Sequence, residues 1–257
     1  MEINNKAVLI TGASSGVGAA LARQLAVHGA KVGVNYCRSE RGAKQVCADI
    51  AASGGEAFAI QGDVGSEDDC ARMVSTIIER FGSLDVLINN AGTTTFIPHR
   101  DLDALTEDIW LRTLRVNVLG AFFMSRLAAK IMATNGGGDI VMTSSIAGIT
   151  ANGSSIAYCA SKAALNSLTR TLAKTLGKDG IRVNAVLPGL IDGDWAYETW
   201  GGGDDVQYAN LKAMFEEQTP LGHVVTADDV AHAITSLVTG SDYITGQLLT
   251  IDSGFTL

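Results

Sequence analysis

The sequence predicts an α/β protein: a single domain, residues 1–257, built on a doubly wound parallel sheet with helices on both faces. Short apolar runs alternate with helical stretches of about 10–25 residues, an order typical of βαβ units with right-handed crossovers. Apolar residues make up 47% of the chain and charged residues 18%, so a large core can form. The 29 glycines and 3 prolines indicate tight turns and exclude collagen-like or Pro/Gly-rich disordered chains.

Seven strands are predicted, each from a short apolar run that is typical of a buried strand. They span residues 6–11, 31–35, 56–61, 85–89, 139–144, 182–187 and 247–251. No linker, low-complexity tract or repeat of fixed period divides the chain, which favours a single domain.

The predicted helices lie between these strands. Ser66 and Thr226 each stand three residues before an Asp, which resembles the start of a capped helix. Gly29, Gly54 and Gly136 follow the last helical positions of three segments and are expected to end them. The predicted helices cover residues 16–29, 39–53, from 66 onward, 106–135, 155–177 and 226–239.

Residues 190–220 form one irregular stretch, which contains Gly201–Gly203. Four of its aromatic residues are costly to leave in water: Trp195, Tyr197, Trp200 and Tyr208. The stretch fits a surface excursion, packed on the body or on a neighbouring subunit. It also fits a mobile lid, because ligands of open α/β sheets bind at the carboxyl ends of the strands. We expect a substrate lid.

The formal net charge is −8 and no basic stripe is present, so binding to nucleic acid or to an anionic membrane surface is not expected. The four cysteines form no C-x-x-C motif and lack a histidine at zinc spacing, which favours free thiols over a metal site or disulfides. The N-terminus is too polar for a signal peptide, and no apolar run approaches the ~18 residues of a membrane span. We expect a cytoplasmic protein without a metal.

A glycine-rich turn, Thr11-Gly12-Ala13-Ser14-Ser15-Gly16-Val17-Gly18, joins the first predicted strand to the first predicted helix. Glycines in this place let the backbone approach a pyrophosphate, and the helix N-terminus faces the anion. The spacing differs from G-x-G-x-x-G, and an ordinary strand–helix turn can look the same. Its place in the first βαβ unit favours a dinucleotide cofactor.

The end of the second predicted strand, Asn35-Tyr36-Cys37-Arg38-Ser39, bears on the choice of cofactor. NAD sites usually carry a carboxylate there, whereas an arginine accommodates the 2′-phosphate of NADP. No carboxylate stands at the strand tip, and Arg38 suits bidentate phosphate binding. NADP(H) is therefore predicted over NAD(H). In the alternative, Arg38 is a solvated residue at a helix start, and Glu40 complicates the choice.

Tyr158 and Lys162 lie four residues apart on a predicted helix and share a face. A free tyrosine has a pKa of about 10, and a cation within ~4–6 Å lowers it toward a range suited to proton transfer on an alcohol oxygen. A surface tyrosine beside a solvated lysine would give the same motif. Ser145 and the segment Asn89–Gly92 end neighbouring strands where such sheets carry ligands, which favours a catalytic pair.

Together these residues resemble the short-chain dehydrogenase/reductase family, and the resemblance covers essentially the whole chain. The motifs that carry it, in order and spacing, are Thr11–Gly18, Asn89-Asn90-Ala91-Gly92, Asn117, Ser145, Tyr158-x-x-x-Lys162, Pro188-Gly189, Ile244-Thr245-Gly246-Gln247 and Asp252-x-Gly254. The family implies a Rossmann fold, an NAD(P) cofactor, oxidoreductase chemistry and often a homotetramer built on two long helices.

The resemblance implies four catalytic residues. Tyr158 would be the general acid/base, and Lys162 would lower its pKa and bind the nicotinamide ribose. Ser145 would hydrogen-bond the substrate oxygen, and a donor aimed at a developing alkoxide stabilises the transition state. Asn117 would hold a water that links Lys162 to solvent.

The resemblance also implies the cofactor contacts. Asp63-Val64 resembles the adenine contact, Asn90 would brace the centre of the sheet, and the backbone of Ile191 would meet the nicotinamide amide. The predicted set is Gly12, Ser14, Ser15, Gly16, Val17, Gly18, Tyr36, Arg38, Ser39, Asp63, Val64, Asn90, Ala91, Gly92, Tyr158, Lys162, Pro188, Gly189 and Ile191.

Three positions depart from the family's usual residues. Gly193 stands where the family often has threonine, so one contact to the nicotinamide carboxamide and phosphates is missing. Ser253 replaces the first glycine of the C-terminal D-G-G. Ser15 stands where many NADP enzymes have arginine or lysine, so the resemblance also allows NAD(H).

The look-alikes nearest by motif are 3-oxoacyl-[acyl-carrier-protein] reductases, which usually present basic residues to an acidic carrier. Gly136 and Asp179 stand at the corresponding places, and only the adjacent Lys178 is basic. We therefore expect NADP(H)-dependent interconversion of a small, apolar, cyclic or aromatic ketone and its secondary alcohol, with carrier-protein reduction as the alternative. The pocket would draw on residues 93–97, 146–149, 152 and the lid. The intact catalytic set disfavours a nucleotide-binding regulator without chemistry.

Overall fold

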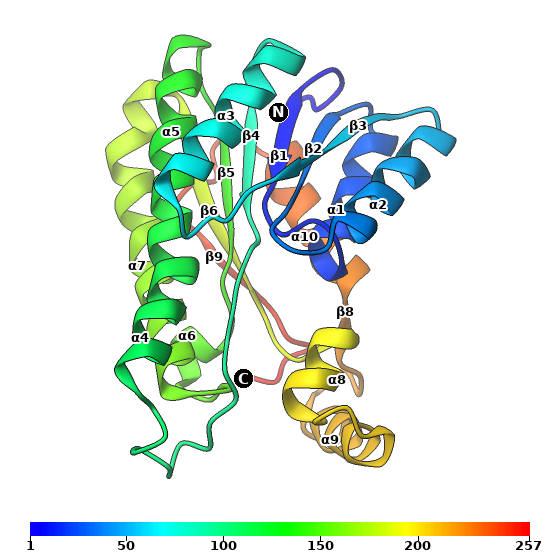
Figure 1. Ribbon diagram of the computed structural model, residues 1–257, viewed down its shortest axis with the longest axis vertical. Coiled ribbons are helices and arrows are strands. Elements are labelled where there is room, and N and C mark those ends of the chain that lie inside the picture. The colour runs from blue at the N-terminus through cyan, green and yellow to red at the C-terminus, as the bar shows by residue number, and fades with distance from the viewer.

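The computed structural model describes residues 1–257. Seven parallel strands form one sheet in the order β3-β2-β1-β4-β5-β6-β9, and helices cover both of its faces (Figure 1). The strand order reverses between β1 and β4, which is where open α/β sheets bind their ligands. The predicted fold class is confirmed. The strands are β1 Ala7–Ile10, β2 Lys31–Tyr36, β3 Glu56–Gln61, β4 Val86–Asn89, β5 Gly138–Thr143, β6 Ile181–Pro188 and β9 Leu248–Ile251.

Each face of the sheet has its own core because successive strand residues point to opposite sides. Val8 and Ile10 of β1 belong to a cluster with α1, α2 and α10, while Leu9 belongs to a second cluster with α3, α5 and α7. All three side chains are fully buried, which accounts for the unbroken apolar run in the sequence. The helices are α1 Gly16–Val27, α2 Glu40–Ala52, α3 Glu67–Phe81, α4 Glu107–Leu114, α5 Ala121–Thr134, α6 Ala147–Thr150, α7 Ile156–Leu176 and α10 Ala227–Thr239.

The segment Glu107–Thr134 is one continuous helix of 28 residues, with a π-helical turn at Arg115–Gly120 between α4 and α5. By length and mean hydropathy alone it could cross a membrane, although the sequence has no uninterrupted apolar run of that length. It packs on the sheet through Met124 and Met132, which are fully buried. Long apolar helices in the cores of globular proteins meet the same two criteria of length and mean hydropathy.

Residues 190–220 are mostly helical, so the expectation of an irregular stretch is wrong. They contain β7 Ile191–Asp192, α8 Asp194–Trp200 and α9 Asp205–Gln218, and β7 pairs with β8 Val225–Thr226. Aromatic and acidic residues are mixed along these helices, and no residue of α9 is buried, so the apolar periodicity that would reveal a helix is weak. In Figure 1 the pair lies beyond the end of the sheet, beside the carboxyl ends of its strands.

Candidate active site

The residues predicted to bind a cofactor follow the carboxyl ends of five parallel strands. Because all strands of the sheet run in one direction, these loops gather at one edge. Residues 12–18 follow β1, residues 36–39 close β2, residues 63–64 follow β3, residues 90–92 follow β4, and residues 188–191 close and follow β6.

The glycine-rich turn after β1 has the geometry of an anion cradle. Gly12 and Gly16 have φ of 62° and 53°, values that favour glycine, and a Cβ at Gly16 would meet no atom within 4 Å. At Gly18 a Cβ would lie 2.7 Å from both the Asn90 side-chain nitrogen and the Gly12 carbonyl oxygen, so α1 needs this glycine to approach the sheet. Open space lies above the turn and the N-terminus of α1 points into it, an arrangement that fits a pyrophosphate.

Asn90 fastens this turn to the middle of the sheet. Its Nδ2 donates to the carbonyls of Thr11 and Gly12 at 3.0 and 3.1 Å, and its backbone N–H donates to the Thr11 hydroxyl at 2.9 Å. The Thr143 hydroxyl of β5 lies 3.4 Å from Asn90 Oδ1. Asn90 therefore joins β1, β4 and β5 at the point where the strand order reverses.

At the tip of β2 one cation is free, and the carboxylate of Glu40 is paired. Arg38 is exposed and forms no ion pair, whereas Glu40 pairs along α2 with Lys44 at 2.7 Å. The Ser39 hydroxyl accepts a hydrogen bond from the Gly42 N–H and so begins α2. A Cβ at Gly42 would stand 2.5 Å from the Ser14 carbonyl oxygen, so the start of α2 packs directly on the glycine-rich turn.

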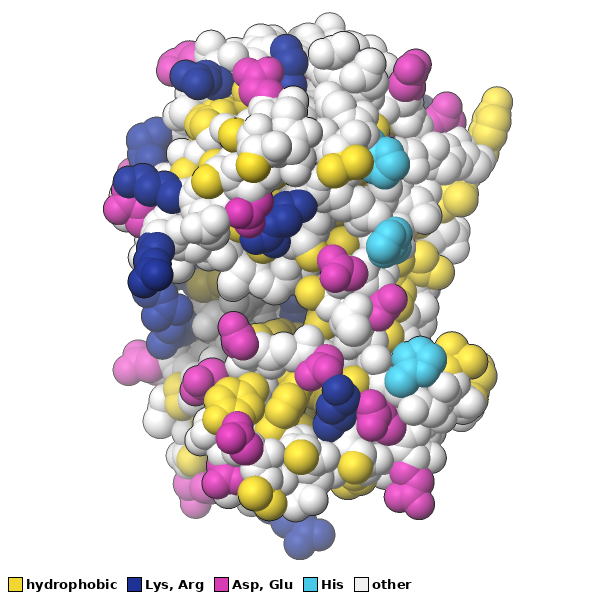
Figure 2. All heavy atoms as spheres, turned by 90° about the vertical axis from the view of Figure 1, so that its right-hand side faces the viewer, with side chains coloured by type: hydrophobic (Ala, Val, Ile, Leu, Met, Phe, Trp, Pro, Cys, Tyr) yellow, Lys and Arg dark blue, Asp and Glu magenta, His cyan; other side chains and the backbone are white.

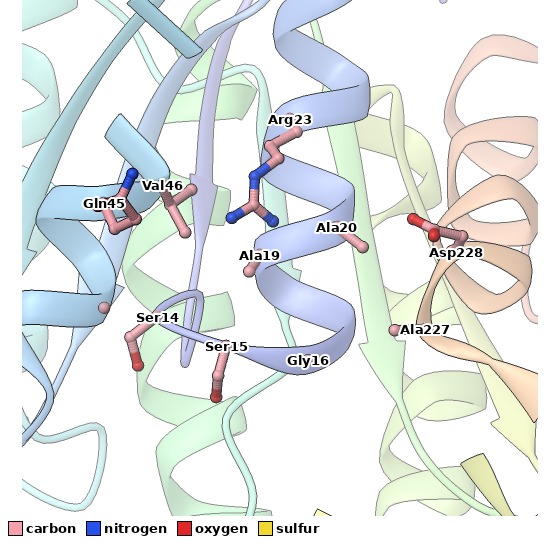
Figure 3. A pocket seen from close by; sticks show the side chains of 11 residues that line it. Ser14, Ser15, Gly16, Ala19, Ala20, Arg23, Gln45, Val46, Ala227 and Asp228 are labelled. Atoms are coloured by element: carbon pink, nitrogen blue, oxygen red, sulfur yellow. The ribbon is translucent and has the colours of Figure 1, made fainter. Parts of the chain in front are cut away.

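Figures 2 and 3 show the surface around this turn. Lys and Arg side chains form a column along one edge of the face in Figure 2, and the surface beside the column is hollowed. In Figure 3 a groove of about 390 Å³ runs between α1, α2 and the start of α10, with Ser14 and Ser15 at its lower end and Arg23 across from Gln45. The groove borders the turn but contains neither Tyr158 nor Lys162.

The structure brings Ser145, Tyr158 and Lys162 together at the carboxyl end of β5. The Ser145 side chain lies close enough to the Tyr158 hydroxyl to influence its pKa, and the Ser145 hydroxyl accepts the Ala147 N–H at 3.1 Å. Lys162 Nζ lies 5.5 Å from the centre of the Tyr158 ring and donates to the Thr143 carbonyl at 2.8 Å. Lys162 can lie beside the Tyr158 ring because the two residues are one turn apart on α7.

Burial governs the protonation of this pair. Tyr158 is 6% exposed, and burial raises its pKa above the ordinary value while the nearby Ser145 side chain opposes the rise. Burial lowers the pKa of Lys162 to about 8. In this structure burial of the phenol sets the direction of the shift, and the lowering of the Tyr158 pKa by Lys162 stays a prediction. Tyr158 is held as a phenol, the form that donates a proton.

Asn117 lies in the π-helical turn, which the sequence did not reveal. A π-turn inserts one residue into a helix and occurs frequently at functional sites. The Asn117 side chain accepts the Thr93 N–H at 2.8 Å and donates to the Thr93 carbonyl and the Ser161 hydroxyl at 2.9 and 3.0 Å. A Cβ at Gly92 would lie 3.7 Å from both Asn117 Oδ1 and Lys162 Nζ, so these side chains converge on the loop after β4.

Two aromatic pairs connect the segment 190–220 to the body, and one of them includes Tyr158. Trp195 of α8 meets the Tyr158 ring edge to face, with ring centres 6.1 Å apart, and Trp200 meets Phe96 at 5.9 Å. Trp195 and Phe96 are nevertheless 52% and 50% exposed. Large apolar side chains so exposed beside a reactive group are typical of a binding surface.

Two site residues were missed by the sequence analysis. The Thr143 carbonyl that receives Lys162 carries no sequence signal, because every residue has a carbonyl. Asn35 in β2 accepts the Gly12 N–H through its side chain at 3.0 Å. A polar amide inside an otherwise apolar strand was the available signal.

Comparison with known proteins agrees with this geometry. Residues 12–256 match the family profile described as Enoyl-(Acyl carrier protein) reductase. The chain is 40% identical over 246 residues to the granaticin polyketide synthase putative ketoacyl reductase 2 of Streptomyces violaceoruber, covering 96% of this chain and 94% of that protein. It is 39% identical to the L-rhamnose 1-dehydrogenase (NAD(P)(+)) of a Sphingomonas species, covering 98% and 96%.

A solved structure gives the same result. The putative short-chain dehydrogenase/reductase from Burkholderia xenovorans superposes with a TM-score of 0.88 at 32% identity, covering 98% of both chains. One family assignment accounts for three features of this structure. They are the strand order, the glycine-rich turn, and the grouping of Ser145, Tyr158 and Lys162. The chain therefore belongs to the short-chain dehydrogenase/reductase family of oxidoreductases, which act on CH–OH and C=O groups.

Proposed function

We propose that this protein is an NADP(H)-dependent oxidoreductase that interconverts a small apolar or cyclic ketone and its secondary alcohol. The observation that carries the proposal is the convergence of three side chains: the Tyr158 phenol, the Lys162 ammonium 5.5 Å from the centre of its ring, and Ser145 beside the phenol. These groups stand at the carboxyl edge of the sheet, next to a turn that fits a pyrophosphate.

In the reducing direction the chain supplies the proton and the binding of the carbonyl oxygen. When bound, a nicotinamide cofactor supplies the hydride. Tyr158 donates its phenolic proton to the carbonyl oxygen, and Ser145 donates a hydrogen bond to the same oxygen as negative charge develops on it. The Lys162 ammonium then stabilises the phenolate, since an opposite charge within a few ångströms favours the ionised form. In oxidation the phenolate removes the alcohol proton.

The preference for NADP(H) rests on the tip of β2. Arg38 is exposed and unpaired there, and Glu40 is engaged by Lys44 along α2 rather than directed at a ribose. A free guanidinium suits a 2′-phosphate, while a ribose 2′-hydroxyl is usually met by a carboxylate. NAD(H) remains the second cofactor, consistent with the NAD(P)(+) in the name of the rhamnose dehydrogenase relative.

The preference for a small uncharged substrate rests on residues 190–220, which we propose act as a lid. This segment contains seven Asp and Glu residues against one lysine, Lys212, which is paired with Asp192. Over the part of the face in Figure 2 that carries α8 and α9, acidic and hydrophobic side chains are mixed. An anionic substrate is repelled by such a segment, while the exposed Trp195 and Phe96 offer apolar, flat surfaces.

Reduction of a 3-oxoacyl group on a carrier protein is the second candidate. It is favoured by the 40% identity to a polyketide synthase ketoacyl reductase. It is disfavoured by the acidic residues of the proposed lid. Gly136 and Asp179 also lack the cation that the resemblance leads us to expect, although they precede β5 and β6, at the edge of the sheet opposite Ser145.

We further propose that the protein acts in the cytoplasm as a homotetramer. Leu111 and Leu119 on the long helix of α4 and α5 are 56% and 44% exposed, which suits a helix that packs on a second copy. Gel filtration with light scattering tests this, and a monomer at micromolar concentration is the contradicting result.

The deciding experiment is a panel of uncharged ketones and secondary alcohols, assayed in both directions with both cofactors. We expect turnover of apolar cyclic ketones, with kcat/KM higher for NADPH than for NADH. In Arg38→Ala the preference for NADPH should fall, and an unchanged preference would show that Arg38 does not bind the 2′-phosphate. A chain that binds NADPH tightly but turns over no ketone would be a nucleotide-binding protein rather than an enzyme.

A further inference from the structure

Asn35 is an amide buried at the carboxyl end of β2. Its exposed fraction is 1%, and Val34, Ile60 and Met73 around it are also buried. Asparagine is depleted in strands, and a buried amide is costly unless its hydrogen-bonding groups are paired. The residue therefore needs a reason beyond strand formation.

The oxygens of Asn35 hold the glycine-rich turn. Its side-chain Oδ1 accepts the Gly12 N–H at 3.0 Å, and its backbone carbonyl accepts the Ala13 N–H at 2.7 Å. On the opposite side of Gly12, a Cβ would stand 2.9 Å from the Ala91 Cα, so the turn is fitted between β2 and the loop after β4. The two amides that begin the turn are thus fixed by one residue of the neighbouring strand.

The nitrogen of Asn35 holds the third strand. Nδ2 donates to the carbonyls of Ile60 and Gly62 at 3.2 and 3.0 Å, and Gly62 directly precedes Asp63. Gly12 presents a donor while Ile60 and Gly62 present acceptors, so only one orientation of the amide satisfies all three. One side chain therefore sets the spacing of the loops after β1 and β3 around the tip of β2, which lie side by side in Figure 1.

We propose that Asn35 is a positioning residue for the adenosine half of the dinucleotide cofactor. It is too deeply buried to touch the cofactor and acts through the turn after β1 and the segment that leads to Asp63. A fully satisfied buried polar network favours a single geometry, so the loops are pre-arranged before binding. The proposal rests on the cofactor site proposed above and is independent of the substrate.

The test compares Asn35→Ala with a matched control, Asn184→Ala. Asn184 is also a buried strand asparagine, 2% exposed, with both ends of its amide bonded. Its Nδ2 donates to the Ile244 carbonyl and its Oδ1 accepts the Gln247 N–H, each at 3.0 Å, so it braces β6 against the segment before β9. Dissociation constants are measured by calorimetry for NADPH, for 2′,5′-ADP as the adenosine half, and for nicotinamide mononucleotide as the other half.

We expect Asn35→Ala to weaken binding of 2′,5′-ADP and NADPH by about tenfold or more, the equivalent of one or two lost hydrogen bonds. Binding of nicotinamide mononucleotide should be unchanged, and kcat at saturating NADPH should stay within about twofold, as expected when only ground-state binding is lost. Asn184→Ala should lower the melting temperature and leave all three constants unchanged. Equal losses in both variants, or wild-type affinity for 2′,5′-ADP in Asn35→Ala, overturn the proposal.

A second variant covers the case in which Asn35→Ala does not fold. Asn35→Asp keeps an oxygen for the Gly12 N–H, but an ionised carboxylate cannot donate to Ile60 and Gly62. Its affinity for 2′,5′-ADP should improve relative to wild type as the pH falls and the carboxyl becomes a donor, and a parallel pH profile contradicts the proposal. If wild-type protein binds neither NADPH nor NADH, the proposed cofactor site is refuted. The positioning role of Asn35 is then refuted as well.

Discussion

Burial of the Lys162 ammonium at the proposed active site lowers the stability of the native state. It is 4% exposed, it has one hydrogen-bond acceptor in Thr143, and burial lowers its pKa to about 8 from 10.5. A pKa lowered by folding means that the unfolded chain binds the proton more strongly. Below pH 8 the charged lysine therefore costs the native state about 3 kcal/mol.

Lys162→Met should consequently stabilise the protein while removing its activity. We expect an unfolding free energy about 2 kcal/mol higher at pH 7, since the lost hydrogen bond to Thr143 offsets part of the gain. The excess stability of the variant should shrink between about pH 8 and 10.5, the range in which wild-type Lys162 loses its proton more readily than the unfolded chain. Urea unfolding at pH 7 and 9.5 measures this, and a variant less stable than wild type at pH 7 contradicts it.

Tyr158→Phe should lower kcat by at least about 10²–10⁴-fold, the usual contribution of a positioned proton donor. Cofactor affinity should be retained because the ring and its contact with Trp195 remain. Tyr243→Phe is the control, since Tyr243 is 98% exposed and touches no site residue. Stopped-flow single turnovers with a saturating ketone separate chemistry from binding, and near-normal rates in Tyr158→Phe would remove this residue as the acid.

Motifs located Ser145, Tyr158 and Lys162 because their spacing is local: thirteen residues from Ser145 to Tyr158 and four from Tyr158 to Lys162. What the sequence did not reveal depends on distant parts of the chain. The raised pKa of Tyr158 comes from burial, and Trp195 of α8 contacts its ring. The role of Asn35 depends on Gly12 and Gly62, which lie 23 and 27 residues away.

Strands and core helices could be predicted to within a few residues because each buries an apolar run or stripe. The second predicted helix, 39–53, is observed as Glu40–Ala52, and the third predicted strand, 56–61, as Glu56–Gln61. The helices α8 and α9 could not be predicted in this way because they bury almost no side chains: Ala196 in α8 and none in α9. The π-turn at Arg115–Gly120 lies inside a long amphipathic stretch, where one inserted residue does not alter the apolar pattern enough to be seen.

Arg182 at the start of β6 connects several elements of the fold. Its guanidinium pairs with Asp139 of β5 at 2.8 Å and also donates to four carbonyls: those of Leu237, Val238, Ser241 and Ile244. The arginine therefore ties the end of α10 and the segment before β9 to the middle of the sheet. Burial raises the pKa of Asp139 to about 6, with Arg182 opposing the rise.

Arg182→Met should lower the unfolding free energy by about 3–5 kcal/mol, since it leaves a buried carboxylate and several carbonyls without a partner. Asp139→Asn should cost less, because the guanidinium keeps its carbonyl acceptors. Chemical unfolding of both variants at pH 7.5 gives the comparison. An equal or larger loss in Asp139→Asn would show that the ion pair, rather than the carbonyl bonds, carries the contribution of Arg182.

Over the whole molecule, charge is divided between two parts of the site. The start of α2 carries Arg38, Arg41 and Lys44 where a phosphate-bearing cofactor is proposed to bind. The segment 190–220 carries seven acidic residues and lies against Tyr158 through Trp195. The net charge of −8 predicted that nucleic acid is not a partner, but only the fold shows that the acidic segment stands at the reacting end. Salt should therefore weaken binding of NADPH, whereas it should favour binding of an anionic substrate.

Salt should distinguish an anionic substrate from an uncharged one. At saturating NADPH, kcat/KM for an anionic substrate such as a 3-oxoacyl carrier protein should rise several-fold between about 0.02 and 0.3 M salt, because screening weakens repulsion by the lid. An uncharged cyclic ketone should change by less than about twofold, since it has no charge to screen. Neutralising exposed lid carboxylates in Glu198→Gln/Glu217→Gln should reproduce the effect at low salt, whereas Glu79→Gln on α3 should not. If kcat/KM for the carrier protein falls as salt is added, the entrance to the site attracts the acidic carrier. That result would favour carrier-protein reduction over the small-ketone activity.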